Sequence, residues 1–184
     1  SADATGNIAE QSGAIVLRHK LNRGQGAALE TGHSYARNIG ADLVLHFDAD
    51  RQFLAEEIPG AIVEMKKSHA DILLGSRFLG RASNIPFTKR CIMMPMARFF
   101  DRMLTGLKLS DSHNGFRILN KKALSVIRLT QDRMAHASEI PALIKKHSLK
   151  YIEFPVTVRY VEYGQGARGG LNIIKDTLTG MFLR

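Results

Sequence analysis

Two aspartates close an apolar run at residues 43–50, in the sequence LVLHFDAD. Asp48 and Asp50 are separated by one small residue, and side chains two positions apart on an extended chain point the same way. The run therefore directs two carboxylates to one point at the end of a predicted strand. Hard oxygen ligands of this kind suit Mg²⁺ or Mn²⁺, which keep waters and bridge to substrate phosphates. Asp-x-Asp also occurs in solvated acidic turns, so the pair alone leaves a metal–diphosphate site and a plain turn both open.

Short apolar runs alternate with helical patterns along the chain, which is typical of an α/β domain. The patterns predict strands over 14–17, 43–47, 71–75, 115–119 and 151–160. They predict helices over 26–39, 59–67, 89–104, 121–129, 138–146 and 171–183. In open α/β sheets, ligands bind at the carboxyl edge of the strands, which is where Asp48 and Asp50 are expected.

The chain opens with a polar segment that resembles a helix N-terminus, because Asp3 and Thr5 precede Ile8 and Ala9. An α/β nucleotide-binding domain normally opens with a buried strand instead. We therefore expect this chain to lack an N-terminal strand–helix unit.

The composition limits the class of protein. The chain has 184 residues, of which 45% are hydrophobic and 23% charged, as in a single globular domain with a sizeable core. Its one cysteine, Cys91, excludes an intrachain disulfide and any multi-cysteine metal site, so we expect a cytoplasmic setting. No apolar stretch reaches the ~18–20 residues of a membrane span. The first residues lack a basic start followed by an apolar core, so we do not expect them to be a signal peptide.

A formal net charge of +9 favours polyanionic partners, namely nucleic acid, anionic lipid headgroups or phosphorylated substrates. The charge alone does not choose among these three. No aromatic RNA-binding run, zinc-finger spacing or heptad array accompanies it, so we expect no nucleic acid partner.

Six short segments occur in a fixed order: NRGQGAALETG (22–32), GADLVLHFDAD (40–50), GSRFLG (75–80), SDSHNGFR (110–117), AHASEI (135–140) and EFPVTVRYVEYG (153–164). Together they resemble family 2 glycosyltransferases, specifically the dolichyl-phosphate mannosyltransferase-like branch. The resemblance implies an α/β, Rossmann-like nucleotide-diphospho-sugar transferase fold with a mixed central sheet flanked by helices. A single domain, 1–184, would then combine a partial nucleotide-sugar-binding half (1–80) with an acceptor half (81–184) that ends in an amphipathic helix.

The same resemblance implies a reaction. A sugar passes with inversion from a UDP- or GDP-sugar to a polyprenyl phosphate, by a cytoplasmic enzyme that can be peripheral on the membrane. Asp48 and Asp50 would hold Mg²⁺ or Mn²⁺, which neutralises the charge that develops on the leaving diphosphate. Asp111 is the candidate base, or it orients an acceptor phosphate that is already ionised. Arg117 would pair with the acceptor phosphate or with Asp111.

Further candidates lie in the loops. For donor binding, where glycines admit close backbone approach and guanidinium groups hold phosphate, they are Asn22, Arg23, Gly24, Gly26, Gln52 and Arg77. For the acceptor phosphate they are Arg90, Arg159 and Arg168. Turns, caps and surface ion pairs are the plain structural alternatives for all of these. His136 and Glu139 share a helix face, and there we favour polar packing or acceptor positioning over a metal site.

Two departures from the family pattern motivate a second hypothesis. Family members usually begin with an extra strand and helix that supply part of the base pocket. They also commonly carry glycine where this chain has Arg51. A non-catalytic remnant that binds anionic lipid or nucleotide is therefore the alternative to an enzyme.

Overall fold

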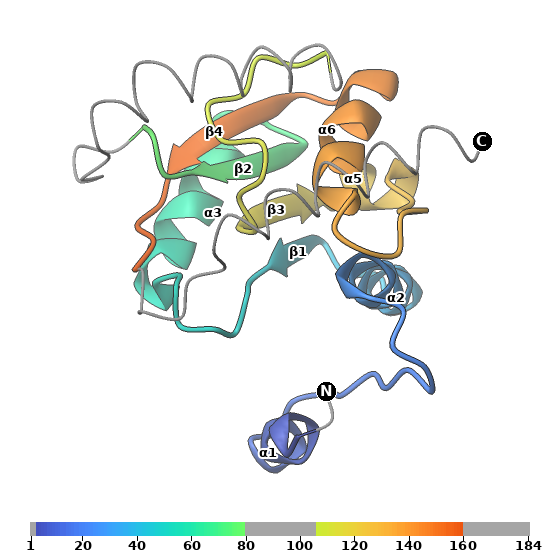
Figure 1. The fold of residues 1–184 in the computed structure, drawn as a ribbon. Helices are drawn as coiled ribbons and strands as arrows, with labels where there is room; N and C mark the ends of the chain where they lie inside the picture. Colours follow the sequence, from blue (N-terminus) through green and yellow to red (C-terminus); the bar gives the residue numbers. More distant parts are fainter. Residues whose placement is uncertain (1–2, 80–105, 160–184) are drawn as a thin grey trace, which may run out of the picture.

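The computed structural model describes residues 3–79 and 106–159 (Figure 1). The elements run in the order α1 (Thr5–Gln11), α2 (Gln25–Asn38), β1 (Leu43–His46), η1 (Ala55–Glu57), α3 (Ile58–Lys67), β2 (Ile72–Ser76), β3 (Arg117–Asn120), α5 (Lys121–Val126), α6 (His136–Lys146) and β4 (Tyr151–Pro155). Strands and helices alternate through much of the chain, so the predicted α/β class is confirmed.

The four strands form one mixed sheet in the order β1-β3-β2-β4. Strand β3 is antiparallel to β1 and β2, whereas β2 and β4 are parallel. Because β3 runs the opposite way, its first residue, Arg117, pairs with His46 at the end of β1. The ends of β1, β2 and β4 and the start of β3 therefore share one edge, which we call the carboxyl edge.

The two central strands are apolar on both faces, as strands covered by helices on both sides should be. Alternate residues of β2 point to opposite faces. Ile72 and Leu74 pack in a cluster with residues of α5 and α6, and Leu73 packs in a second cluster with residues of α3. Burying a leucine or isoleucine side chain stabilises the fold by about 1.5–3 kcal/mol, so these layers fix where the carboxyl edge lies.

Strand β1 lies at the margin of this sheet. Among the described residues it pairs with β3 alone, and its side chains Leu43, Val44 and Leu45 are only half-buried. The uninterrupted apolar run predicts full burial, and that part of the prediction is wrong for the described part of the molecule. Only His46 of β1 is buried.

The strand predicted over 14–17 does not form. The segment is irregular, and Ile15 and Leu17 are 69% and 42% exposed. A strand needs a neighbour for its hydrogen bonds, and none of the described strands lies beside this run. Helix α1 precedes it, as predicted, and stands apart from the sheet in Figure 1.

The other predicted elements are confirmed with small shifts of their ends. Helix α5 stops at Val126 because Ile127 adopts an extended backbone. Strand β4 stops at Pro155, although Val158 still makes an antiparallel bridge to Phe53. The helices predicted over 89–104 and 171–183 lie outside the described residues. Within the described parts, no helix combines the length and apolar character that crossing a bilayer requires.

Candidate active site

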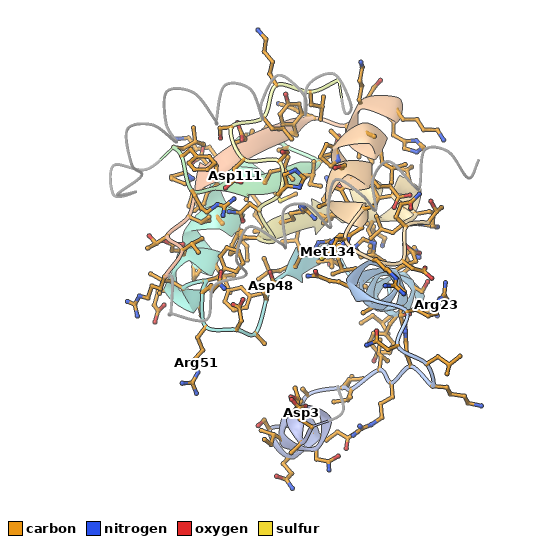
Figure 2. The ribbon with its side chains drawn as sticks, in the orientation of Figure 1. Asp3, Arg23, Asp48, Arg51, Asp111 and Met134 are labelled. Carbon is orange, nitrogen blue, oxygen red and sulfur yellow. The ribbon has the colours of Figure 1, made fainter. Side chains whose placement is uncertain are left out.

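Asp48 lies two residues beyond the end of β1, at the carboxyl edge (Figure 2). Its carboxylate is partly buried, and the side-chain amide of Gln25 donates a hydrogen bond to its Oδ1 at 3.2 Å. The other oxygen rests on Gly115, where an added Cβ would lie 2.3 Å from Oδ2. Gly115 is therefore needed for this close approach. The Asp48 carboxylate is held between α2 and the start of β3.

The charge of Asp48 is only partly compensated. Burial raises its pKa first, and the neighbouring carboxylate of Asp50 raises it further, while the guanidinium of Arg117 acts in the opposite direction. Asp50 itself is exposed, and its Oδ1 accepts a hydrogen bond from the backbone N–H of Gln52 at 3.0 Å. The charge of Asp50 therefore acts on Asp48 at the edge where a ligand is expected.

This donor set fits a hard divalent cation. Carboxylate oxygens are the ligands that Mg²⁺ and Mn²⁺ prefer, and a cation would relieve the repulsion between Asp48 and Asp50. Within 3–79 and 106–159, no group of three or more histidine, cysteine or carboxylate side chains is placed to share a metal ion. An ion bound at the pair would therefore complete its coordination with water or substrate phosphate.

Arg51 separates Asp50 from Gln52 and adopts a left-handed backbone with φ of 65°. A residue with a Cβ is strained there, which explains why glycine suits this position in the family pattern. Figure 2 shows its side chain extending away from the sheet, below Asp48. In this arrangement the side chain of Arg51 does not cover Asp48.

The second aspartate cluster consists of Asp111 with its partners Arg77 and Asn114, and Asp111 lies in the loop before β3. Asp111 is buried and accepts two parallel hydrogen bonds from Arg77, from Nε to Oδ2 and from Nη2 to Oδ1, each of 2.7 Å. The backbone N–H of Arg77 and the side-chain amide of Asn114 also donate to Oδ2, at 3.1 and 3.2 Å. Asp111, the candidate base, and Arg77, a candidate for donor binding, thus form one bidentate ion pair.

Arg117 is buried beneath both clusters. Its Nη2 donates to the carbonyl oxygen of Ser112 at 3.3 Å. Burial lowers the pKa of Arg117 to about 10, and the negative charges of Asp48 and Asp111 oppose that shift. The guanidinium is 2% exposed, so it acts as a fixed cation between the two aspartate clusters.

Gly24 and Gly26, in the loop at 22–26, lie close to another loop of the protein, at 131–133. An added Cβ on Gly26 would lie 1.9 Å from the carbonyl oxygen of Gln131. Gly24 has φ of 97°, and its added Cβ would lie 2.8 Å from the carbonyl oxygen of Asp132. Packing between the loops at 22–26 and 131–133 therefore explains this glycine spacing.

The polar residues of the same loop are also engaged locally. Arg23 donates from Nε and Nη2 to the carboxylate of Asp132, both at 2.9 Å. The Oδ1 of Asn22 accepts from the backbone N–H of Gly24 at 3.0 Å, which closes a turn. These two donor candidates hold the loop in place, and the amide that reaches Asp48 belongs to Gln25.

Helix α6 organises the opposing loop. Glu139 accepts hydrogen bonds from both the N–H and the hydroxyl of Thr130 and from the N–H of Gln131. His136 donates from Nδ1 to the carbonyl oxygen of Arg133 at 2.6 Å. These contacts agree with polar packing of His136 and Glu139, and acceptor positioning stays a prediction.

Two candidates meet beside the site. The backbone N–H of Arg159 donates to the carbonyl oxygen of Gln52 at 2.9 Å, next to the bridge between Phe53 and Val158. Arg159, a candidate for binding the acceptor phosphate, and Gln52, a candidate for binding the sugar donor, therefore lie side by side. Arg90 and Arg168 lie outside the described residues.

Three residues of the site are not among the candidates that the sequence predicts. Gln25 contacts Asp48, and Asn114 contacts Asp111. Glu153 of β4 accepts from the N–H and hydroxyl of Ser110, at 2.7 and 2.6 Å, which anchors the loop that carries Asp111. A charged residue inside an otherwise apolar strand is the signal that points to Glu153.

The fold is that of nucleotide-sugar transferases. Glucosyl-3-phosphoglycerate synthase from Mycobacterium tuberculosis, solved with Mg²⁺ and uridine diphosphate, matches with a TM-score of 0.63 and 15% identity, over 97% of this chain and 64% of that one. Mannosyl-3-phosphoglycerate synthase from Rubrobacter xylanophilus matches with a TM-score of 0.61 and 16% identity, over 97% of this chain and 58% of that one. At these identities the likeness concerns the fold alone.

Residues 1–128 match the family model described as glycosyl transferase family 2. The UDP-N-acetylglucosamine–dolichyl-phosphate N-acetylglucosaminyltransferase of Methanococcus voltae is 33% identical over 159 residues, which are 84% of this chain and 62% of that protein. The polyprenol monophosphomannose synthase of Mycolicibacterium smegmatis is 25% identical over 184 residues, or 94% of this chain and 69% of that protein.

The chain belongs to glycosyl transferase family 2. It spans about three fifths of the Methanococcus voltae transferase and of the matched solved chains. Membership of this family indicates a transferase and does not favour the alternative of a non-catalytic remnant.

Proposed function

We propose that this chain transfers a sugar, with inversion, from a nucleotide-sugar to a polyprenyl phosphate. The observation that carries the proposal is the under-neutralised carboxylate pair, Asp48 and Asp50, at the carboxyl edge of a nucleotide-sugar transferase fold. Two relatives act on dolichyl phosphate and on polyprenol, which supports the class of acceptor. We further propose that residues 1–80 serve the donor and 81–184 the acceptor.

The donor diphosphate would lie over Asp48 and Asp50. Mg²⁺ or Mn²⁺ bound there supplies Lewis-acid stabilisation of the departing nucleoside diphosphate. Gln52, a proposed donor contact, follows the pair, and its backbone N–H donates to Oδ1 of Asp50. Arg23 and Asn22 contribute by fixing the loop at 22–26 against the loop at 131–133.

The acceptor needs little activation. A phosphate oxygen is ionised near neutral pH, so it attacks the anomeric carbon while the bond from that carbon to the diphosphate oxygen breaks. The electron pair leaves with the nucleoside diphosphate. Asp111 is bound by Arg77 in a bidentate ion pair, so we assign it to orientation rather than to proton removal.

The positive charge for the acceptor phosphate would come from the arginines near this edge. Arg159 is exposed and lies next to Gln52, and we propose Arg90 and Arg168 as its partners. An acceptor with a polyprenyl tail would bring the enzyme to the cytoplasmic surface of a membrane. The nucleotide is a UDP or GDP carrier in this proposal.

The test is donor-dependent formation of a glycosylated polyprenyl phosphate, followed by mass spectrometry with UDP- and GDP-sugars and Mn²⁺. Asp50→Asn should lower the rate by about two orders of magnitude or more, because it removes a metal ligand. Asp42→Asn, an exposed aspartate at the other end of β1, is the matched control and should leave the rate unchanged. An unchanged rate for Asp50→Asn would show that the metal assignment is wrong.

A further inference from the structure

We propose that Gln25 is a positioning residue, which sets the orientation of the Asp48 carboxylate for the divalent cation. This inference rests on the proposed function, because it concerns the same carboxylate pair. The observation is the hydrogen bond of 3.2 Å from Nε2 of Gln25 to Oδ1 of Asp48. Gln25 is the first residue of α2 and lies 23 positions before Asp48, so local sequence does not impose this contact.

Asp48 is constrained on both of its oxygens. Oδ2 rests on the backbone of Gly115, which leaves no room for a Cβ, and Oδ1 accepts the amide of Gln25. A carboxylate offers about four lone-pair sites, so one hydrogen bond to Oδ1 leaves capacity for a metal ion. Rotation of the carboxylate is therefore restricted while its charge stays available.

Gln25 is itself held by its neighbours. On one side, Arg23 is bound by two hydrogen bonds to Asp132. On the other, Gly26 packs on the carbonyl of Gln131, and the N–H of Ala27 donates to the carbonyl of Asp132 at 3.0 Å. The backbone at 23–27 is thus fixed before any ligand binds, which lowers the entropy cost of placing the amide.

The chemistry of an amide suits this role. Gln25 donates a hydrogen bond without a positive charge, so it orients the carboxylate and does not repel an incoming cation. Groups that hydrogen-bond metal ligands fix their geometry, and their removal weakens metal binding by about tenfold or more. Because Gln25 is exposed, we expect an effect at the lower end of this range.

The test is a calorimetric titration of Mn²⁺ into the protein with UDP present. Gln25→Met keeps the length of the side chain and removes its donor, and Gln25→Asn keeps the amide but shortens its reach. Both should bind Mn²⁺ about tenfold more weakly than the wild type. Gln11→Met, in the exposed helix α1, is the matched control and should bind as the wild type does. The thermal midpoint of each variant without metal should stay the same.

The outcomes distinguish the positioning role of Gln25 from the proposed function. Equal Mn²⁺ affinity of the wild type and of either folded Gln25 variant overturns the positioning role and leaves the proposed function intact. No Mn²⁺ binding by the wild type overturns the metal site and the positioning role together. Weaker binding by both variants with an unchanged midpoint supports the inference.

Discussion

Two aspartate clusters share the carboxyl edge, and they differ in how their charge is balanced. Asp111 is buried, and Arg77 satisfies both of its oxygens. Asp48 is partly buried, and burial raises its pKa, which the charge of Asp50 raises further. The comparison sets a carboxylate with a bidentate counter-ion against a pair for which we propose that the counter-ion is a bound cation.

The largest effect should come from removing the internal counter-ion. Arg77→Met removes the bidentate counter-ion of the buried Asp111, so the free energy of unfolding should fall by about 3 kcal/mol in urea titrations. The matched control is Arg18→Met, which removes the exposed ion pair with Glu10 and should cost less than about 1 kcal/mol. Similar losses for the two variants would contradict the contrast between the two clusters.

A buried histidine pair should make the fold sensitive to acid. His33 of α2 and His46 of β1 share a hydrogen bond of 2.7 Å between their Nε2 atoms. Their Nδ1 atoms have no hydrogen-bond partner among the described residues, although Oε2 of Glu30 lies 3.7 Å from Nδ1 of His33. Burial lowers the pKa of His33 to about 4 and that of His46 well below its usual value of 6.5. Both are therefore neutral in the folded state, while the unfolded chain takes up protons below pH 6.5.

Stability should thus be complete above pH 6.5 and should fall towards pH 4, by about 1.4 kcal/mol per pH unit for each proton. Urea titrations across this range measure the slope. His33→Leu should reduce the slope by about the share of one proton and leave the share of His46, whereas His147→Gln, at the exposed end of α6, should not change it. An undiminished slope in His33→Leu would assign the acid sensitivity to other groups.

Weakening the contact that anchors the Asp111 loop should have a smaller effect on the free energy of unfolding. Glu153→Gln weakens the hydrogen bonds that Ser110 donates to the carboxylate, so we expect a loss of about 1–2 kcal/mol in the free energy of unfolding. Mn²⁺ affinity should remain unchanged, because the contacts of Asp48 are untouched. A loss of Mn²⁺ affinity would show that the two clusters act as one unit.

The smallest effect should be a gain in stability. Arg51→Gly relieves the left-handed backbone next to Asp50 and should raise the free energy of unfolding by up to about 1 kcal/mol. Differential scanning calorimetry measures the shift. The glycosyl transfer rate should stay within a factor of about two, since the Arg51 side chain extends away from the sheet. A large fall in rate would give this arginine a role in phosphate binding.

The sequence predicts the position of Asp48 and Asp50 well, because it depends on one apolar run and on the rule for strand edges. It does not predict the partners that distinguish the clusters. Arg77 and Asp111 are 34 residues apart, and Arg23 and Asp132 are 109 apart, so no local pattern links them. The wrong strand at 14–17 has the same cause, since a strand forms only when a neighbour pairs with it.

The central claim is that the Asp48–Asp50 pair acts through a bound divalent cation. The most direct measurement is the rate of glycosyl transfer to a polyprenyl phosphate after chelation with EDTA and after Mn²⁺ is added back, in the wild type and in Asp48→Asn. We predict that chelation abolishes transfer, that Mn²⁺ restores it in the wild type, and that Asp48→Asn stays inactive with Mn²⁺. Transfer that continues at the full rate in EDTA would contradict the account.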